Sequence, residues 1–278
     1  DGEAVIADRI PSATIIFADI VDFTPMVART EPSALLRRLS ALFLAFDDMA
    51  DRHGVEKIKT IGDAYTAQCF VTADQDNNQI NAFHPGAMQH SHENSLGDYL
   101  PLRVAIISPD GRDGMIKHAR DCAERGVPLM FDPGQQLPMF NGEELLTFLE
   151  QASYLACNDY EFEMVMDRTG LTLQDIASRL DALIVTRGEK GSEIHAGGER
   201  YDIPAVPATA VVDPTGCGDA YRAGLLYGIA QGYDWKTSGR IASLLGSIKI
   251  GHQGGQNHSF TPAEVADKFE AAFGYRFK

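Results

Sequence analysis

The chain has 278 residues, of which 24 are Lys or Arg and 39 are Asp or Glu, so its formal net charge is -15. This acidic balance argues against nucleic acid or an anionic membrane surface as a partner, because both require clustered basic side chains. A hydrophobic content of 44% is enough for a sizeable core, in one large α/β domain or in two smaller ones.

The four cysteines are scattered and form no Cys-x-x-Cys pair, which disfavours a disulfide framework and a zinc site. The sequence has no signal-peptide layout and no apolar stretch of about 18 residues, so we expect a cytoplasmic protein without a membrane span. The chain begins with Asp1 rather than Met, which indicates that its natural start is missing.

Apolar and amphipathic patterns predict the first elements of the chain. Residues 13–20 form an apolar run typical of a buried strand, and a helical pattern follows at 31–52. Two further strand patterns, at 65–73 and 79–83, flank a polar segment at 74–78. This arrangement predicts a β-hairpin.

The remainder of the chain alternates between strand and helix patterns, which predicts an α/β fold with a largely parallel sheet. The expected strands are 102–107, 127–131, 154–157 and 182–186. The expected helices are 114–125, 143–152, 161–168, 173–180, 218–231, 235–252 and 262–273.

The run from Asp213 to Tyr221, Asp-Pro-Thr-Gly-Cys-Gly-Asp-Ala-Tyr, joins a glycine turn, a carboxylate and the start of an apolar helix. Gly216 and Gly218 let the backbone turn tightly and bring bare N–H groups close to a ligand, at the positive end of the helix. An anion such as phosphate is expected there. Asp219 would then lie beside the anion as a proton acceptor. The alternative is a simple Gly-rich turn between strand and helix.

The same run resembles the signature of the ribokinase-like PfkB family of sugar and nucleoside kinases, and residues 65–278 resemble its adenosine-kinase type. The resemblance implies a three-layer, largely parallel sheet with helices on both faces. It also implies ATP and Mg²⁺ as cofactors, with adenosine or a sugar as the acceptor. Asp219 matches the family's base. The matching anion-hole residues are Thr215, Gly216, Cys217 and Gly218.

Two other segments match family patterns. Asn158 and Glu161 match an Asn-x-x-Glu pattern that orients Mg²⁺, water and phosphate in the family, although Asn158 can equally cap the following helix. Thr186, Gly188 and Gly191 match the family's ATP loop, with a plain strand-to-strand turn as the alternative. A weaker match places residues 251–257 near the adenine. Residues 132–135 match a family segment at a strand end near the phosphates, with a plain turn as the alternative. Cys217 is expected to be a small packing residue rather than a reactive thiolate.

The front of the chain has a different resemblance. Residues 4–65 closely resemble the start of a class III adenylate cyclase catalytic domain, whose strand, helix and strand belong to an α+β fold. By that resemblance Asp19 and Asp63 match two metal-binding aspartates, and Lys59 matches the lysine that reads adenine. The alternative is that both acids are solvated residues at strand ends, because paired carboxylates alone bind Mg²⁺ poorly.

The two resemblances predict a chimera of a cyclase-like fragment, residues 1–64, and a kinase core, residues 65–278. In PfkB kinases the acceptor is held mainly by an N-terminal Asp, a Gly-Gly pair and an Asn, and residues 1–64 contain no Gly-Gly pair. We therefore expect a kinase core that binds ATP but has lost efficient transfer. The alternatives are an engineered, catalytically inert chimera and, nearly excluded because its later catalytic residues are missing, an adenylate cyclase.

Overall fold

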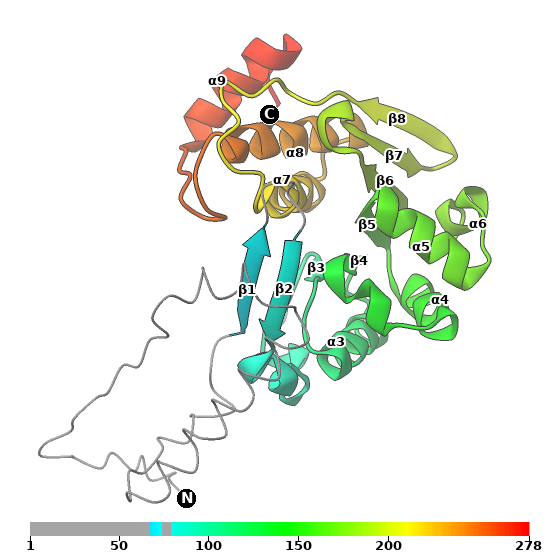
Figure 1. Cartoon of the computed structure of the whole chain (residues 1–278). Coiled ribbons are helices and arrows are strands. Elements are labelled where there is room, and N and C mark those ends of the chain that lie inside the picture. The colour runs from blue at the N-terminus through cyan, green and yellow to red at the C-terminus, as the bar shows by residue number, and fades with distance from the viewer. Residues whose placement is uncertain (1–66, 74–78, 100, 278) are drawn as a thin grey trace, which may run out of the picture. The chain divides into compact units, whose positions relative to one another are not determined.

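The computed structural model describes residues 67–73, 79–99 and 101–277 (Figure 1). The chain divides into two units, residues 1–84 and 85–278, which are described separately. The strand predicted at 13–20 and the helix predicted at 31–52 lie outside the described residues. Within those residues, no helix has the length and apolar character needed to cross a membrane.

The predicted β-hairpin is confirmed. Strand β1 (Gln68–Ala73) pairs antiparallel with β2 (Gln79–His84), so that Gln68 lies opposite His84 and Ala73 lies opposite Gln79. The unit of residues 1–84 contains this hairpin, whereas the sequence boundary at 64/65 assigns it to the kinase core. That boundary stays a prediction.

Residues 85–278 contain a six-stranded sheet whose strands neighbour one another in chain order. The first four strands are parallel and the last two are antiparallel, which confirms an α/β fold with a largely parallel sheet. The strands are β3 (Ala105–Ile107), β4 (Leu129–Phe131), β5 (Tyr154–Asn158), β6 (Ala182–Thr186), β7 (Ser192–Ala196) and β8 (Glu199–Ile203).

The pair β7 and β8 was not predicted. Strand β8 is mostly polar, with exposed Glu199 and Arg200, so it carries no apolar run of the kind that marks a buried strand. The turn between the two strands is made by Gly197 and Gly198, at φ values of 59° and 80°. A two-residue Gly-Gly turn is a hairpin signal that the sequence did contain.

The helices lie close to their predicted ranges because most of them begin at a strong capping residue. Asn141, Asn158, Thr172 and Thr261 each form a capping box with an acid three residues later. The α-helices are α3 (Arg112–Glu124), α4 (Gly142–Gln151), α5 (Asp159–Thr169), α6 (Leu173–Ala177), α7 (Cys217–Gln231), α8 (Trp235–Ile250) and α9 (Pro262–Phe273). Short 3-10 helices, none of them predicted, are η2 (Gly86–Glu93), η3 (Leu96–Tyr99), η4 (Gly134–Met139) and η5 (Gly188–Lys190).

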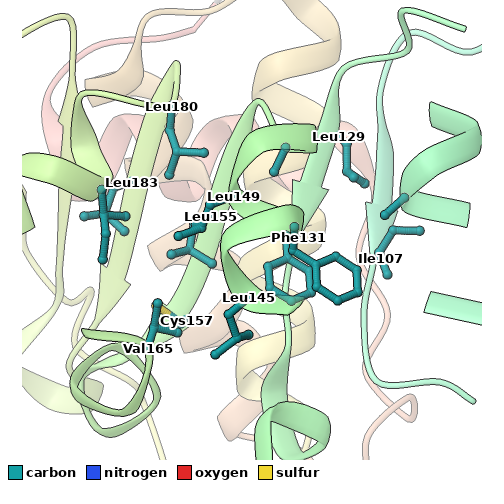
Figure 2. Packing of buried hydrophobic residues seen from close by; sticks show 14 of the residues in the cluster. Ile107, Leu129, Phe131, Leu145, Leu149, Leu155, Cys157, Val165, Leu180 and Leu183 are labelled. Carbon is teal, nitrogen blue, oxygen red and sulfur yellow. The ribbon is translucent and has the colours of Figure 1, made fainter. Parts of the chain in front are cut away.

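Side chains alternate between the two faces of the sheet, which gives the three layers. Leu129, Phe131 and Leu155 point toward the layer of α3, α4, α5 and α6, where Figure 2 shows them with side chains of α4 and α5. The Phe131 ring stacks on Phe148 of α4 at 4.3 Å between centroids. Met130, from the opposite face of β4, packs in the cluster that contains residues of α7 and α8. The predicted arrangement of helices on both faces is confirmed.

Helices α7 and α8 lie side by side at very close range (Figure 1). A Cβ atom added to Gly224 of α7 would lie 2.7 Å from the Cα atom of Ala242 in α8 and 2.9 Å from its backbone nitrogen. Because backbone atoms cannot move aside as a flexible side chain can, this crossing requires a glycine.

We therefore expect Gly224→Ala to lower the free energy of unfolding by about 1–3 kcal/mol, the usual cost of overpacking a core. Helix propensity alone would favour the alanine by about 1 kcal/mol. Gly246→Ala in α8 is the matched control, since its Cβ would meet only the Cys217 carbonyl oxygen, at an ordinary 3.6 Å. Urea unfolding of both variants measures the difference, and equal midpoints would contradict the close approach.

Candidate nucleotide and phosphate site

The predicted glycine turn precedes α7, in the register expected from the sequence. Gly216 is the residue before the helix and has φ 80° and ψ 5°, in the left-handed region that favours glycine. A Cβ atom at this position would also lie 3.0 Å from the Cα atom of Gly255. The turn is thus packed against the segment 251–257, which the sequence analysis placed near the same ligand.

The turn leaves backbone donors free at the start of α7. The Cys217 N–H donates to the Pro214 carbonyl at 3.1 Å, and the Ala220 N–H donates to the Gly216 carbonyl at 3.0 Å. The N–H groups of Gly218 and Asp219 between them donate to no acceptor within residues 67–73, 79–99 and 101–277. Unpaired N–H groups at the positive end of a helix of this length form a site for an anion.

The Asp219 side chain lies in this first turn and is exposed. Its carboxylate has no hydrogen-bond or ion-pair partner in the described part of the chain, so it is available to a ligand. An exposed carboxylate beside free N–H donors can accept a proton from a hydroxyl group while the donors hold an anion.

A cavity of about 500 Å³ adjoins the glycine turn, a volume within the usual range for small-molecule sites. Five of the predicted binding residues line it: Thr186, Gly188, Gly191, Cys217 and Gly218. Thr215, Gly216, Asn158, Glu161 and Asp219 are not among its lining residues. The prediction therefore located one wall of the cavity and the turn beside it.

The other walls of the cavity were missed. They come from residues between 205 and 211, which have no regular secondary structure, and from one face of α8, including Ser243, Gly246 and Ile250. Neither segment carries a local motif. Their proximity arises from packing of α8 against α7 and from the path of the chain after β8.

The predicted loop after β6 is compatible with both alternatives that the sequence left open, and its role as an ATP loop stays a prediction. It is a strand-to-strand turn, because β6 and β7 pair antiparallel through η5, and it also lines the cavity. Gly191 has φ 85°, and a Cβ atom there would lie 2.1 Å from the Ile203 carbonyl oxygen. Only glycine permits this close turn.

The Asp213 carboxylate connects the glycine turn to the segment 251–257 through hydrogen bonds. One carboxylate oxygen accepts a hydrogen bond from the Thr215 N–H at 2.9 Å. The other accepts bonds from the Gly254 N–H at 2.7 Å and the Gln253 amide at 3.1 Å. The bonds from Thr215 and Gly254 lower the pKa of Asp213 to about 2, so the side chain is a carboxylate at neutral pH.

Asn158 and Glu161 form the capping box of α5. The Asn158 side chain accepts a bond from the Glu161 N–H at 2.7 Å, and the Glu161 carboxylate accepts one from the Asn158 N–H at 2.8 Å. The helix-cap alternative is therefore confirmed. Their role toward Mg²⁺ stays a prediction, and one Glu161 oxygen has no partner in the described residues that would prevent it.

Asp132 is buried in an ion pair with Arg222, and its predicted place near the phosphates stays a prediction. The Arg222 Nε and Nη2 atoms each donate to one Asp132 oxygen at 2.9 Å. Ser108, after β3, donates to the same carboxylate at 3.3 Å. Arg222 was missed because its partner lies 90 positions away in the sequence. The pair links the end of β4 to the turn that carries Asp219.

The Cys217 thiol behaves as a packing group. Burial raises its pKa, and its Sγ lies 4.0 Å from the Asp213 carbonyl oxygen. This agrees with the expected packing role and disfavours a reactive thiolate.

In the ranges that the structure describes, no three His, Cys, Asp or Glu side chains form a cluster that could hold a metal ion. Asp19, Asp63 and Lys59, the metal-binding and adenine-reading residues expected from the cyclase resemblance, lie outside these ranges.

Comparisons with known proteins agree with this geometry. The model of the pfkB family carbohydrate kinases matches residues 46–263. A nucleoside kinase from Methanocaldococcus jannaschii is 35% identical over 208 residues, which are 74% of this chain and 67% of that protein. A solved structure of Burkholderia thailandensis nucleoside kinase in complex with inosine is 54% identical, with a TM-score of 0.74 over 76% of this chain and 70% of that one.

A shorter match concerns a different class of protein. An adenylate cyclase from Mycobacterium bovis is 49% identical over 61 residues, which are 22% of this chain and 14% of the cyclase. The PfkB match, by contrast, covers more than three quarters of the chain and includes the glycine turn, the loop after β6 and the cavity walls. The chain therefore belongs to the PfkB family of carbohydrate kinases.

Proposed function

We propose that this chain is an ATP-dependent phosphotransferase of the nucleoside-kinase type. The observation that carries the proposal is the start of α7, where free N–H groups of Gly218 and Asp219 adjoin an exposed carboxylate and a cavity of about 500 Å³. A cavity of this size suits the adenosine part of ATP. The turn would hold the phosphate that is transferred.

The relatives support a nucleoside as acceptor. The Burkholderia thailandensis kinase, 54% identical over the matched region, was also solved in complex with ADP-inosine. We therefore expect a purine nucleoside such as inosine or adenosine as the acceptor here, with a sugar as the alternative.

In the proposed reaction Asp219 accepts the proton of the acceptor hydroxyl, and the N–H groups of the turn stabilise the negative charge of the phosphoryl group. Mg²⁺ is usually held by one or two carboxylates together with substrate phosphates. Glu161 has one carboxylate oxygen that accepts no bond from the described residues, and we expect it to approach a Mg²⁺ ion bound to ATP.

The chimeric organisation is also a proposal. The 61-residue match to an adenylate cyclase supports a cyclase-like segment at residues 1–64, followed by the kinase core at 65–278. Asp19, Asp63 and Lys59 would then be vestiges of a cyclase site. The kinase family model begins at residue 46, inside that segment, so the two resemblances overlap in sequence.

If residues 1–64 do not hold the acceptor, transfer should be slow because the acceptor is poorly positioned. Correct positioning contributes about 7–11 kcal/mol to well-oriented reactions. We therefore expect ATP to bind with ordinary affinity, and the rate of transfer to rise with nucleoside concentration without saturating.

We place this activity in the cytoplasm, consistent with the free thiols of Cys122, Cys157 and Cys217.

The test is to incubate the protein with Mg-ATP and inosine and to separate the nucleotide products. IMP formed together with ADP supports the kinase. Cyclic AMP would instead support the cyclase resemblance, which covers only 14% of the matched cyclase. Neither product, at any inosine concentration, would indicate an inert chimera and would contradict the proposal.

A further inference from the structure

The cavity beside the glycine turn has no basic side chain in its described lining. Glu189, which lines the cavity, adds a negative charge. Asp213 and Asp219 add two further carboxylates at the turn itself. A polyphosphate that binds here needs positive charge from somewhere other than the cavity wall.

Lys249 lies beneath this turn. Lys249 belongs to the last turn of α8 and is fully buried, with 0% of its surface exposed. The Nζ atom donates to the Asp213 carbonyl oxygen at 2.6 Å and to the His252 carbonyl oxygen at 3.3 Å. Both acceptors are backbone carbonyls, and the ammonium group pairs with no carboxylate in the described ranges.

A buried ammonium group that forms no ion pair with a carboxylate is costly, because desolvation of a charge is expensive. The charge of Lys249 does reach the Asp213 carboxylate, where it adds to the hydrogen bonds that lower the pKa of that group. Its field is also poorly screened by solvent, so it acts on other charges nearby. The Asp213 carbonyl that it contacts stands four residues before Cys217, the first residue of α7. The Cys217 Sγ shares that carbonyl at 4.0 Å, which places the ammonium directly behind the start of the helix.

We propose that Lys249 is a positioning residue that supplies a buried positive charge behind the glycine turn, and that it favours nucleotides in proportion to the negative charge of their phosphates. This inference rests on the proposed function, because it assumes that a nucleotide occupies the cavity. Lys249 acts through the turn and its field, without touching the ligand. The hydrogen bonds to Asp213 and His252 hold the charge in place.

The alternative is that Lys249 has only a structural role, in which its hydrogen bonds connect the loop of Asp213 to the loop of His252. The two roles differ in one measurable respect. A loosened loop weakens the binding of every nucleotide by a similar factor, whereas loss of a charge weakens ATP more than ADP and ADP more than AMP.

The variants are Lys249→Met, which removes both charge and donors, and Lys249→Gln, which removes the charge but keeps an N–H donor group. Gln253→Ala is the matched control. It removes another hydrogen bond between the same loops, the 3.1 Å bond from the Gln253 amide to Asp213, and leaves the net charge of the protein unchanged. Dissociation constants for AMP, ADP and ATP are measured by displacement of a fluorescent ATP analogue, without divalent cations. Thermal unfolding checks that each variant is folded.

For both Lys249 variants we expect the affinity to fall by an additional factor of about three to ten for each further negative charge along the series, as a charge at close range predicts. Gln253→Ala should weaken all three nucleotides by one common factor.

Equal losses across the series in Lys249→Gln would overturn the inference, and so would failure of both Lys249 variants to fold, since Lys249 would then serve stability alone. Failure of the unmodified protein to displace the analogue with any nucleotide would instead contradict the proposed function. The two failures are therefore distinguishable.

Discussion

Asp219→Asn is expected to lower the rate of phosphoryl transfer by about 10²–10⁴-fold, the range that a positioned general base contributes. The amide is close in shape to the carboxylate but cannot accept the proton of the acceptor hydroxyl. ATP binding should persist, since the free N–H groups of Gly218 and Asp219 belong to the backbone and remain in the variant. The defect should thus appear in the slope of the rate against inosine concentration, which is kcat/KM, and not in the dissociation constant for ATP.

The measurement compares initial rates of ADP release and ATP affinity in the variant and the unmodified protein. Asp175→Asn is a suitable control, because Asp175 is an acid in the first turn of α6 whose carboxylate caps its own helix. That control should lose some stability and retain its turnover. Unchanged turnover in Asp219→Asn would show that Asp219 is not the general base.

Arg222→Met is expected to destabilise the fold by about 3–5 kcal/mol, because it leaves the buried carboxylate of Asp132 without its ion-pair partner. Asp132 is only 5% exposed and Arg222 only 9%, so solvent cannot replace the lost bonds easily. The Ser108 hydroxyl, at 3.3 Å, is the remaining side-chain donor to that carboxylate in the described residues.

The double variant Asp132→Leu with Arg222→Met removes both charges and should recover most of the lost stability, because apolar replacement of a whole buried pair is often neutral. Urea unfolding of the two single variants and the double variant forms a complete cycle. Additive losses would show that the pair does not act as a unit. A loss below about 1 kcal/mol in Arg222→Met would mean that the carboxylate is effectively solvated.

Much of the fold was predictable because its signals are local. Helix α9 begins and ends as predicted, between the capping residue Thr261 and Gly274, which has φ 77°. Strand β6 is an apolar run that is buried on both faces, and its predicted range, 182–186, is also the observed one. Strands β7 and β8 were missed because neither carries such a run, and the helix predicted at 173–180 ends earlier, at Ala177.

The candidate site was only half predictable. The glycine turn and the loop after β6 have local motifs, and five of the binding residues predicted from them line the cavity. The partnership of Asp132 with Arg222 spans 90 positions in the sequence, and the bond from Lys249 to Asp213 spans 36. Such contacts depend on how helices pack on the sheet, so no local pattern could reveal them.

The most direct test of the proposed function is transfer of the labelled γ-phosphate of ATP to inosine, followed over a range of inosine concentrations. The account predicts labelled IMP whose rate of formation rises with inosine without reaching saturation and falls by about 10²–10⁴-fold in Asp219→Asn. Absence of labelled IMP at every concentration, from a protein that is folded and binds ATP, would contradict it.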